Sequence, residues 1–227
     1  MSRYLEISQF RKSFDVVTNW VYYPIASYLC ALFSFTAITP NVITIIAILF
    51  ELAAVSLILY DFHIYKIMIT ILLQFGYIFD LIDGMLARYN KTGYYDPKRP
   101  SLKGYYLDSV SDHVLRFIIF GSLVYIYVLK FSNGWLLGLI FIIIHGILQT
   151  EHTLRLLILK HKRENGRKNN ISLIGQVALL HNNVYLFYLI FIPLNRLDLF
   201  FIIYIVGGVL LVFKRIFQFL SQNETIF

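Results

Sequence analysis

Long apolar runs, separated by short polar stretches, dominate the chain. A helix needs about 20 apolar residues to cross the ~30 Å hydrocarbon core of a bilayer. Stretches that approach this length are Val42–Tyr60, Ile64–Arg88, Tyr105–Leu129, Trp135–Leu159, Gln176–Pro193 and Leu197–Phe213. The pattern therefore predicts an all-α integral membrane protein with six transmembrane helices.

The N-terminal residues follow a different pattern. Apolar residues recur at helical spacing over positions 1–23, and the charged residues lie largely off that stripe, which consists of Tyr4, Ile7, Phe10, Phe14, Val17 and Val21. An amphipathic helix of this kind lies along the membrane surface. Ile25–Ile38 is short for a span and is expected to complete this surface element. We therefore divide the chain into an interfacial segment (1–39) and a six-helix membrane domain (40–227).

Composition supports the membrane assignment. The chain is 58% hydrophobic and only 15% charged, whereas soluble domains are about 25% charged. These values exclude a soluble globule, a disordered chain and a coiled coil. The single cysteine, Cys30, excludes a disulfide framework and a zinc finger. The net charge of +7 is interpreted as a signal of topology and of contact with anionic lipids, and not of nucleic-acid binding.

Lys and Arg are distributed unevenly between the two sets of loops. Fifteen lie in the N-terminal segment, in the stretches 88–103 and 160–168, and after the last span. The opposite loops hold only Lys66, Lys130 and Arg196. The positive-inside rule then predicts that both termini and the two long loops face the cytoplasm. In a bacterium the membrane would be the inner, cytoplasmic one.

Acidic residues gather at the facing ends of the second and third predicted helices. The second helix ends in Asp80-Leu-Ile-Asp83-Gly84-Met-Leu-Ala87-Arg88, and the third begins Gly104-Tyr-Tyr-Leu-Asp108-Ser-Val-Ser-Asp112. Each set shares one helical face, and successive crossings run in opposite directions, so the acids should lie at one depth near the cytoplasm. Four facing carboxylates need cations, and hard divalent ions prefer oxygen ligands. The pattern favours a two-metal site for phosphate esters.

Other interpretations of these residues stay open. Small residues in membrane helices often serve close helix packing, and an intramembrane Asp pair can form a proton relay or ion pathway. A cation or proton carrier that uses the Asp cluster is therefore the alternative function, although carriers usually show repeats or broken helices and this sequence shows neither. A scaffold that has kept the residues and lost turnover is a third interpretation.

These residues resemble the signature of the CDP-alcohol phosphotransferase (phosphatidyltransferase) family, D-x2-D-G-x2-A-R followed by G-x3-D-x3-D. All eight signature positions are present. Pro40-Asn41-Val-Ile-Thr44 is similar to the P-N-x-x-T that opens the first crossing in the family. The stretch between Arg88 and Gly104 is longer than is usual and contains two prolines, so we expect a loop within Tyr89–Lys103. His113 replaces a common Arg or Lys and is interpreted as a packing variant.

The resemblance implies transfer of a substituted phosphate group from a CDP-alcohol to the hydroxyl of an acceptor, with release of CMP. It implies that two Mg²⁺ or Mn²⁺ ions bind Asp80, Asp83, Asp108 and Asp112, and that Asp112 is the catalytic residue that deprotonates the acceptor. By the same analogy the CDP-binding residues are Asp80, Gly84, Ala87, Arg88, Gly104 and Asp108. The expected donor is CDP-diacylglycerol or a similar CDP-lipid.

The acceptor is less well defined. Arg155, near the cytoplasmic end of the fourth helix, and Lys160, which begins a basic run, are candidates to bind an anionic acceptor; membrane anchoring explains them equally well. Leu107-Asp108-Ser109 is similar to inositol-type members, so inositol phosphate or inositol, or else glycerol phosphate, is expected. Membrane lipids are further partners, and a homodimer is left open.

Two more intramembrane charges need partners. Arg116 lies one turn after Asp112 and is expected to form an i, i+4 ion pair with it. Glu51 lies in the middle of the first predicted crossing, where we expect an interhelical hydrogen bond to satisfy it.

Overall fold

The computed structural model describes residues 2–11, 15–131, 134–163 and 184–221. The regular secondary structure of these ranges is entirely helical, as predicted. By length and hydropathy, Pro40–Tyr95, Ser109–Lys130 and Leu197–Lys214 qualify as candidate membrane spans, whereas the apolar helical stretch Gly134–Thr150 is shorter. The all-α membrane architecture is thus confirmed, and the count of six crossings stays a prediction.

A sharp bend divides the long helix α3 (Pro40–Tyr89) into two antiparallel halves. Asp61 has non-helical backbone angles (φ −159°, ψ 94°), and its carboxylate accepts hydrogen bonds from the backbone N–H groups of His63 and Ile64, both at 3.0 Å. Asp61 therefore caps the second half. Phe50 stacks on Phe75 across the pair, with ring centroids 5.6 Å apart. The two halves contain the first two predicted crossings.

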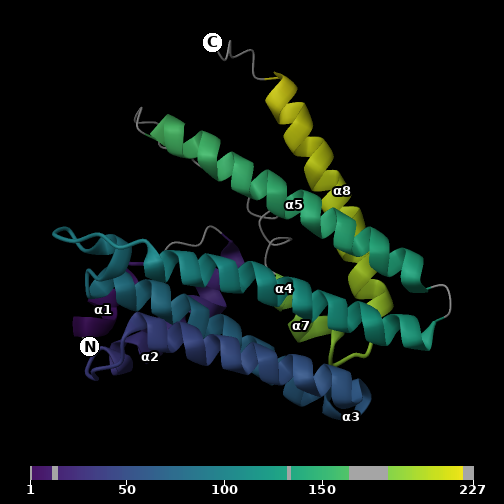
Figure 1. Ribbon diagram of the computed structural model, residues 1–227, viewed down its shortest axis with the longest axis horizontal. Helices are drawn as coiled ribbons and strands as arrows, with labels where there is room; N and C mark the ends of the chain where they lie inside the picture. The colour runs from purple at the N-terminus through teal and green to yellow at the C-terminus, as the bar shows by residue number, and fades with distance from the viewer. Residues whose placement is uncertain (1, 12–14, 132–133, 164–183, 222–227) are drawn as a thin grey trace.

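The remaining long helices pack each on the one before it, starting from α3. Helix α4 (Lys103–Lys130) lies along α3, α5 (Gly134–Arg163) crosses over α4, and α8 (Leu197–Ser221) packs against α5 (Figure 1). These helices contain the third, fourth and sixth predicted crossings. The fifth, Gln176–Pro193, lies partly outside the described residues; its described part is the short helix α7 (Val184–Phe191), which contacts α3. The predicted loop after Tyr89 contains one 3-10 turn, η2 (Gly93–Tyr95).

The prediction of one amphipathic helix over positions 1–23 is wrong. Helix α1 ends at Ser8 (Ser2–Ser8), and a π-helical turn, η1 (Thr18–Tyr22), leads into α2 (Tyr23–Phe33). The chain folds back so that α1 packs against α2, and Arg11 joins them by donating hydrogen bonds to Ser27 and Tyr4. A single helical period cannot describe a chain that reverses. Val21, which belongs to the predicted apolar stripe, is accordingly 49% exposed.

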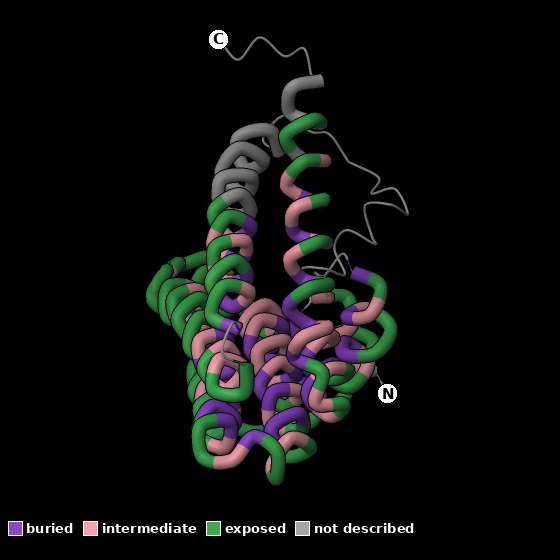
Figure 2. The backbone as a smooth tube through the Cα atoms, turned by 90° about the vertical axis from the view of Figure 1, so that its right-hand side faces the viewer, coloured by how far each residue is buried: buried purple, intermediate pink, exposed green. Residues whose placement is uncertain are grey.

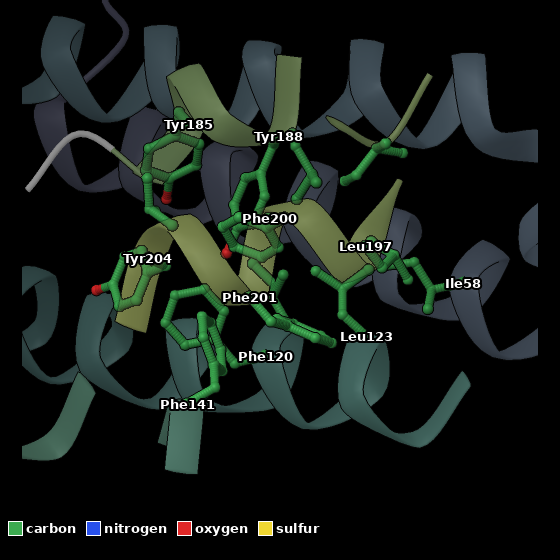
Figure 3. Close-up of a cluster of buried hydrophobic side chains, with 14 of the residues drawn as sticks. Ile58, Phe120, Leu123, Phe141, Tyr185, Tyr188, Leu197, Phe200, Phe201 and Tyr204 are labelled. Atoms are coloured by element: carbon green, nitrogen blue, oxygen red, sulfur yellow. The ribbon is translucent and has the colours of Figure 1, made fainter. Parts of the chain in front are cut away.

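Two apolar clusters hold the helices together. The larger joins α3, α4, α5, α7 and α8 through aromatic side chains (Figure 3). Phe141 of α5 meets Phe120 edge-on, at 4.8 Å between centroids and 80°, and also contacts Phe201 at 4.7 Å; edge-to-face geometry is favourable for aromatic pairs. The smaller cluster fixes α1 and α2 to the second half of α3. It includes Cys30, whose thiol pKa is raised to about 12 by burial against the opposing effect of Arg88, so the thiol stays neutral.

The outward-facing surface of the helices is apolar. Burial alternates along each helix, with exposed positions on the outside of the bundle (Figure 2). Large exposed side chains include Leu49, Ile64, Ile203 and Leu210. Contiguous apolar surface of this kind is rare on soluble monomers and is the surface that lipid tails solvate.

Gly76 allows the two halves of α3 to approach, and its replacement should be destabilising. A Cβ at this position would lie 2.6 Å from Cγ of Glu51. Glu51 is buried and held by a hydrogen bond, so it cannot move away without cost. We expect Gly76→Ala to cost about 1–3 kcal/mol through overpacking, measured as a lower unfolding temperature in detergent. The matched control is Gly121→Ala, where a Cβ meets nothing within 4 Å; equal melting of the two variants would contradict the argument.

Candidate active site

The two halves of the acidic signature lie on helices that pack against each other. Asp80 and Asp83 lie toward the end of α3, and Asp108 and Asp112 lie in the first turns of α4. Both sets adjoin the loop between the helices, at the end of the molecule that also holds α1 (Figure 1). Asp80, Gly84 and Ala87, which the helical repeat places on one side of α3, are all half-buried.

Asp83 is the most deeply placed of the signature acids whose side chains are described. It is 5% exposed, and one carboxylate oxygen accepts a hydrogen bond from the Thr44 hydroxyl at 2.5 Å. Thr44 belongs to the first half of α3, so the pair joins the two halves. A buried carboxylate needs such a donor, because an unsatisfied one is costly. The sequence analysis identified Thr44 as part of a motif but predicted no partner for its side chain. The structure shows that this partner is Asp83.

Asn41, which belongs to the same Pro40–Thr44 motif, lies next to Gly104 in the second half of the signature. Oδ1 of Asn41 lies 3.0 Å from the point where a Cβ would stand on residue 104. Only a glycine at 104 lets the start of α4 come this close to Asn41 without displacing it. Asn41 and Thr44, one helical turn apart, therefore contact one half of the signature each.

Arg88 is positioned by contacts with the N-terminal segment and with the loop after Tyr89, which the sequence analysis did not predict. Its Nε donates a hydrogen bond to the backbone carbonyl of Phe10 at 3.0 Å, and its guanidinium lies 5.9 Å from the ring centroid of Tyr95. A Cβ at Gly84 would come within 3.3 Å of Nη1 of Arg88. The side chain thus extends over the glycine, between the N-terminal segment and the loop.

The expected partners of Arg116 and Glu51 are both present. Nη2 of Arg116 lies 3.9 Å from a carboxylate oxygen of Asp112, as an i, i+4 pair. Glu51 is 5% exposed and accepts a hydrogen bond from the Tyr185 hydroxyl of α7 at 2.5 Å. His113 bonds to its own helix: its Nδ1 donates to the Ser109 carbonyl at 2.7 Å, in line with a packing role.

The acceptor candidates cannot be placed in the site. Arg155 and Lys160 lie on α5, and their side chains are outside the described residues. The cavity that the structure shows, of about 140 Å³, lies at the opposite end of the bundle between His63, Lys130 and Arg196. The acceptor assignment therefore stays a prediction.

The signature acids fit a hard divalent cation by their chemistry. They offer only carboxylate oxygens, which Mg²⁺ and Mn²⁺ prefer. Among the described side chains, however, no three acidic, His or Cys residues gather into a metal-binding group, and the side chain of Asp108 lies outside that set. Thr44 and Arg116 contact the carboxylates of Asp83 and Asp112 instead.

Loss of the Thr44 hydroxyl should impair catalysis more than stability. Thr44→Val keeps the shape and removes the donor to Asp83, which then adopts other orientations. We expect a fall in kcat of about tenfold, the scale of a hydrogen bond to a charged group. Thr70→Val is the matched control, because Thr70 is also buried on α3 and donates only to the Lys66 carbonyl of its own helix, at 2.8 Å. Equal kcat values for the two variants would contradict a role for Thr44 in positioning Asp83.

Comparison with known proteins identifies these features as a family pattern. The model of the CDP-alcohol phosphatidyltransferase family matches residues 37–219, which is most of the chain. Members are membrane-bound transferases of phospholipid synthesis that act on CDP-alcohol donors and alcohol acceptors, and they typically use divalent metals. A comparison with curated proteins gave no match. The match gives no support to a homodimer.

Proposed function

The chain belongs to the CDP-alcohol phosphatidyltransferase family, and we propose on this basis that it transfers a phosphatidyl group from CDP-diacylglycerol or a similar CDP-lipid. The acceptor is the hydroxyl of inositol phosphate, inositol or glycerol phosphate, and CMP is released. One observation supports the proposal: the two stretches of the signature lie toward the end of α3 and at the start of α4, which pack against each other, and Thr44 and Asn41 each lie against one of them.

The proposed reaction is a single displacement at the β-phosphorus of the CDP-lipid. The acceptor oxygen forms a bond to that phosphorus, the bond to the CMP oxygen breaks, and CMP leaves with the electron pair. Asp112 takes the proton of the acceptor hydroxyl. Its side chain is 35% exposed, so it is accessible to an acceptor at the end of the bundle.

The other signature residues bind and orient in this proposal. Mg²⁺ or Mn²⁺ held by Asp80, Asp83, Asp108 and Asp112 would neutralise the phosphate oxygens as negative charge develops. Arg88 extends over Gly84 and offers a planar, permanently charged group to the diphosphate. Gly84 and Gly104, whose small size admits Arg88 and Asn41 beside the two backbones, would line the nucleotide pocket together with Ala87.

We further propose that this end of the molecule faces the cytoplasm. Helix α1, which carries Arg3, lies at this end with the end of α3 and the start of α4, which carry Arg88 and Lys103 (Figure 1). Lys130 and Arg196 lie together beside the bend of α3, at the other end. The positive-inside rule requires an excess of Lys and Arg on the cytoplasmic side, and the sequence has that excess in the segments at the signature end. Both termini and the CDP-lipid site would then be cytoplasmic.

The direct test is CMP release by the purified protein. CDP-diacylglycerol is supplied with inositol phosphate, inositol, glycerol 3-phosphate or serine, each with Mg²⁺ or Mn²⁺ and with chelator. A second arm supplies CDP-linked headgroups with diacylglycerol, which reverses the roles of lipid and headgroup. CMP release that depends on one acceptor identifies it, and no release in either arm would overturn the proposal.

Replacement of Arg155 should affect the acceptor selectively if the acceptor is anionic. An Arg binds a phosphate through two hydrogen bonds, and Lys cannot reproduce that geometry. We expect Arg155→Lys to raise the KM of the acceptor far more than that of the CDP-lipid, and Arg155→Ala to cost about 2 kcal/mol in kcat/KM. Arg163→Lys, on the same helix, is the control. Equal changes in both KM values would remove Arg155 from the acceptor site.

A further inference from the structure

Arg116 is an intramembrane cation whose hydrogen-bonding capacity is not filled. It lies within the candidate span Ser109–Lys130, where a charge is costly and needs a reason. Its Nε is buried and has no hydrogen-bond partner among the described residues. Its distance of 3.9 Å from Asp112 is longer than the 2.7–2.9 Å typical of a charge-assisted hydrogen bond. The ion pair is therefore loose, and little holds the guanidinium to this one carboxylate.

Carboxylates from three directions act on this guanidinium. Asp112 lies on its own helix, and Asp80 acts on it from the second half of α3. Glu51, on the first half of α3, interacts electrostatically with both Arg116 and Asp112. Tyr185 and Tyr188 of α7 also interact with it electrostatically, as does Tyr204 of α8. Arg116 thus interacts with two signature acids and with one acid that does not belong to the signature.

The position of Glu51 is fixed by its neighbours. The Tyr185 hydroxyl donates to it, and Gln74 in turn donates to the Tyr185 backbone carbonyl at 2.9 Å. The absence of a side chain at Gly76 provides the space that Glu51 occupies. Glu51 is therefore an acidic group held in a fixed position within electrostatic reach of Arg116.

We infer that Arg116 is a built-in counter-cation of the signature carboxylates, which partly neutralises Asp112 in the metal-free protein and competes with the divalent cation for it. The inference rests on the proposed function, because it assumes that these carboxylates bind metal. Arg116 acts through Asp112 and is a positioning residue. A divalent ion in direct contact attracts a carboxylate more strongly than a single charge at 3.9 Å does, so the metal displaces Arg116, at a cost in affinity.

Two substitutions should change metal affinity in opposite directions. Arg116→Gln removes the competing charge, so Mn²⁺ should bind at least about tenfold more tightly, because a +1 and a +2 charge about 6 Å apart repel by that much even at the dielectric constant of water. Glu51→Gln removes the acid outside the signature that interacts with Arg116, which leaves Arg116 to the signature carboxylates, so Mn²⁺ should bind severalfold more weakly. Arg116→Lys keeps the charge and should leave Mn²⁺ affinity near that of the native protein. A purely structural role would not tighten metal binding in any variant.

The experiment titrates the purified full-length chain in detergent with Mn²⁺ and follows free Mn²⁺ by electron paramagnetic resonance. CMP release is measured separately on the same samples. Unchanged or weaker Mn²⁺ affinity in Arg116→Gln would overturn the inference, and CMP release by the native protein would still support the proposed function. If Arg116→Gln does not fold, the Glu51→Gln variant provides the test. Unchanged or tighter Mn²⁺ binding by Glu51→Gln would also overturn the inference. A native protein that binds no Mn²⁺ but releases CMP in chelator would overturn the inference and the metal assignment together.

Discussion

Asp80→Asn should abolish transfer while the protein still folds and inserts. Asn has nearly the size of Asp and lacks the charge that a divalent cation and Arg116 both require. We expect kcat/KM to fall at least about a hundredfold, which corresponds to about 2.7 kcal/mol of transition-state stabilisation. CMP release under saturating Mg²⁺ measures the loss, and gel filtration in detergent shows whether the variant is intact.

The bend of α3 offers a control for this substitution. Asp61→Asn makes the same chemical change on the same helix, at the opposite end of the bundle. Asn also caps helices well, so the hydrogen bonds to His63 and Ile64 should survive and activity should stay near native. A hundredfold loss in both variants would indicate a general effect of charge on folding and would argue against a catalytic site at Asp80.

Asp112→Asn should separate turnover from binding. If Asp112 is chiefly the base, kcat falls by about two to four orders of magnitude, the range of general acid–base catalysis, while CDP-lipid and Mn²⁺ still bind. If Asp112 is chiefly a metal ligand, Mn²⁺ affinity falls as well. Single-turnover CMP release together with Mn²⁺ titration distinguishes the two roles. A variant with native turnover and native binding would remove Asp112 from the mechanism.

Local patterns were sufficient to predict most of the helices and the existence of two contacts of intramembrane charges. Apolar runs located the two halves of α3, α4, α5 and α8, because a lipid-exposed helix needs little beyond length and hydropathy. The cost of an intramembrane charge predicted that Glu51 and Arg116 have partners, and the structure shows Tyr185 and Asp112 in those places. The identity of Tyr185 was not predictable, since it lies on a helix distant in sequence.

Contacts that depend on the path of the chain were missed. The reversal between α1 and α2 produces no break in hydropathy, so positions 1–23 resembled one helix. The hydrogen bond from Arg88 to Phe10 uses a backbone carbonyl, which has no sequence signal. The bond from Thr44 to Asp83 requires the two halves of α3 to pair in a particular register. The alternation of apolar residues leaves that register open, and the bend at Asp61 sets it.

The bend at Asp61 also bears on how the protein is made. Its cap is formed by residues 61–64 alone, so the reversal needs no later part of the chain. We expect residues 40–89 to enter the membrane during synthesis as one helical hairpin, with Thr44 already beside Asp83 before α4 leaves the ribosome. Lengthening the turn with glycines would uncouple the two insertions, and the nascent chain would then present Asp83 to lipid without its partner.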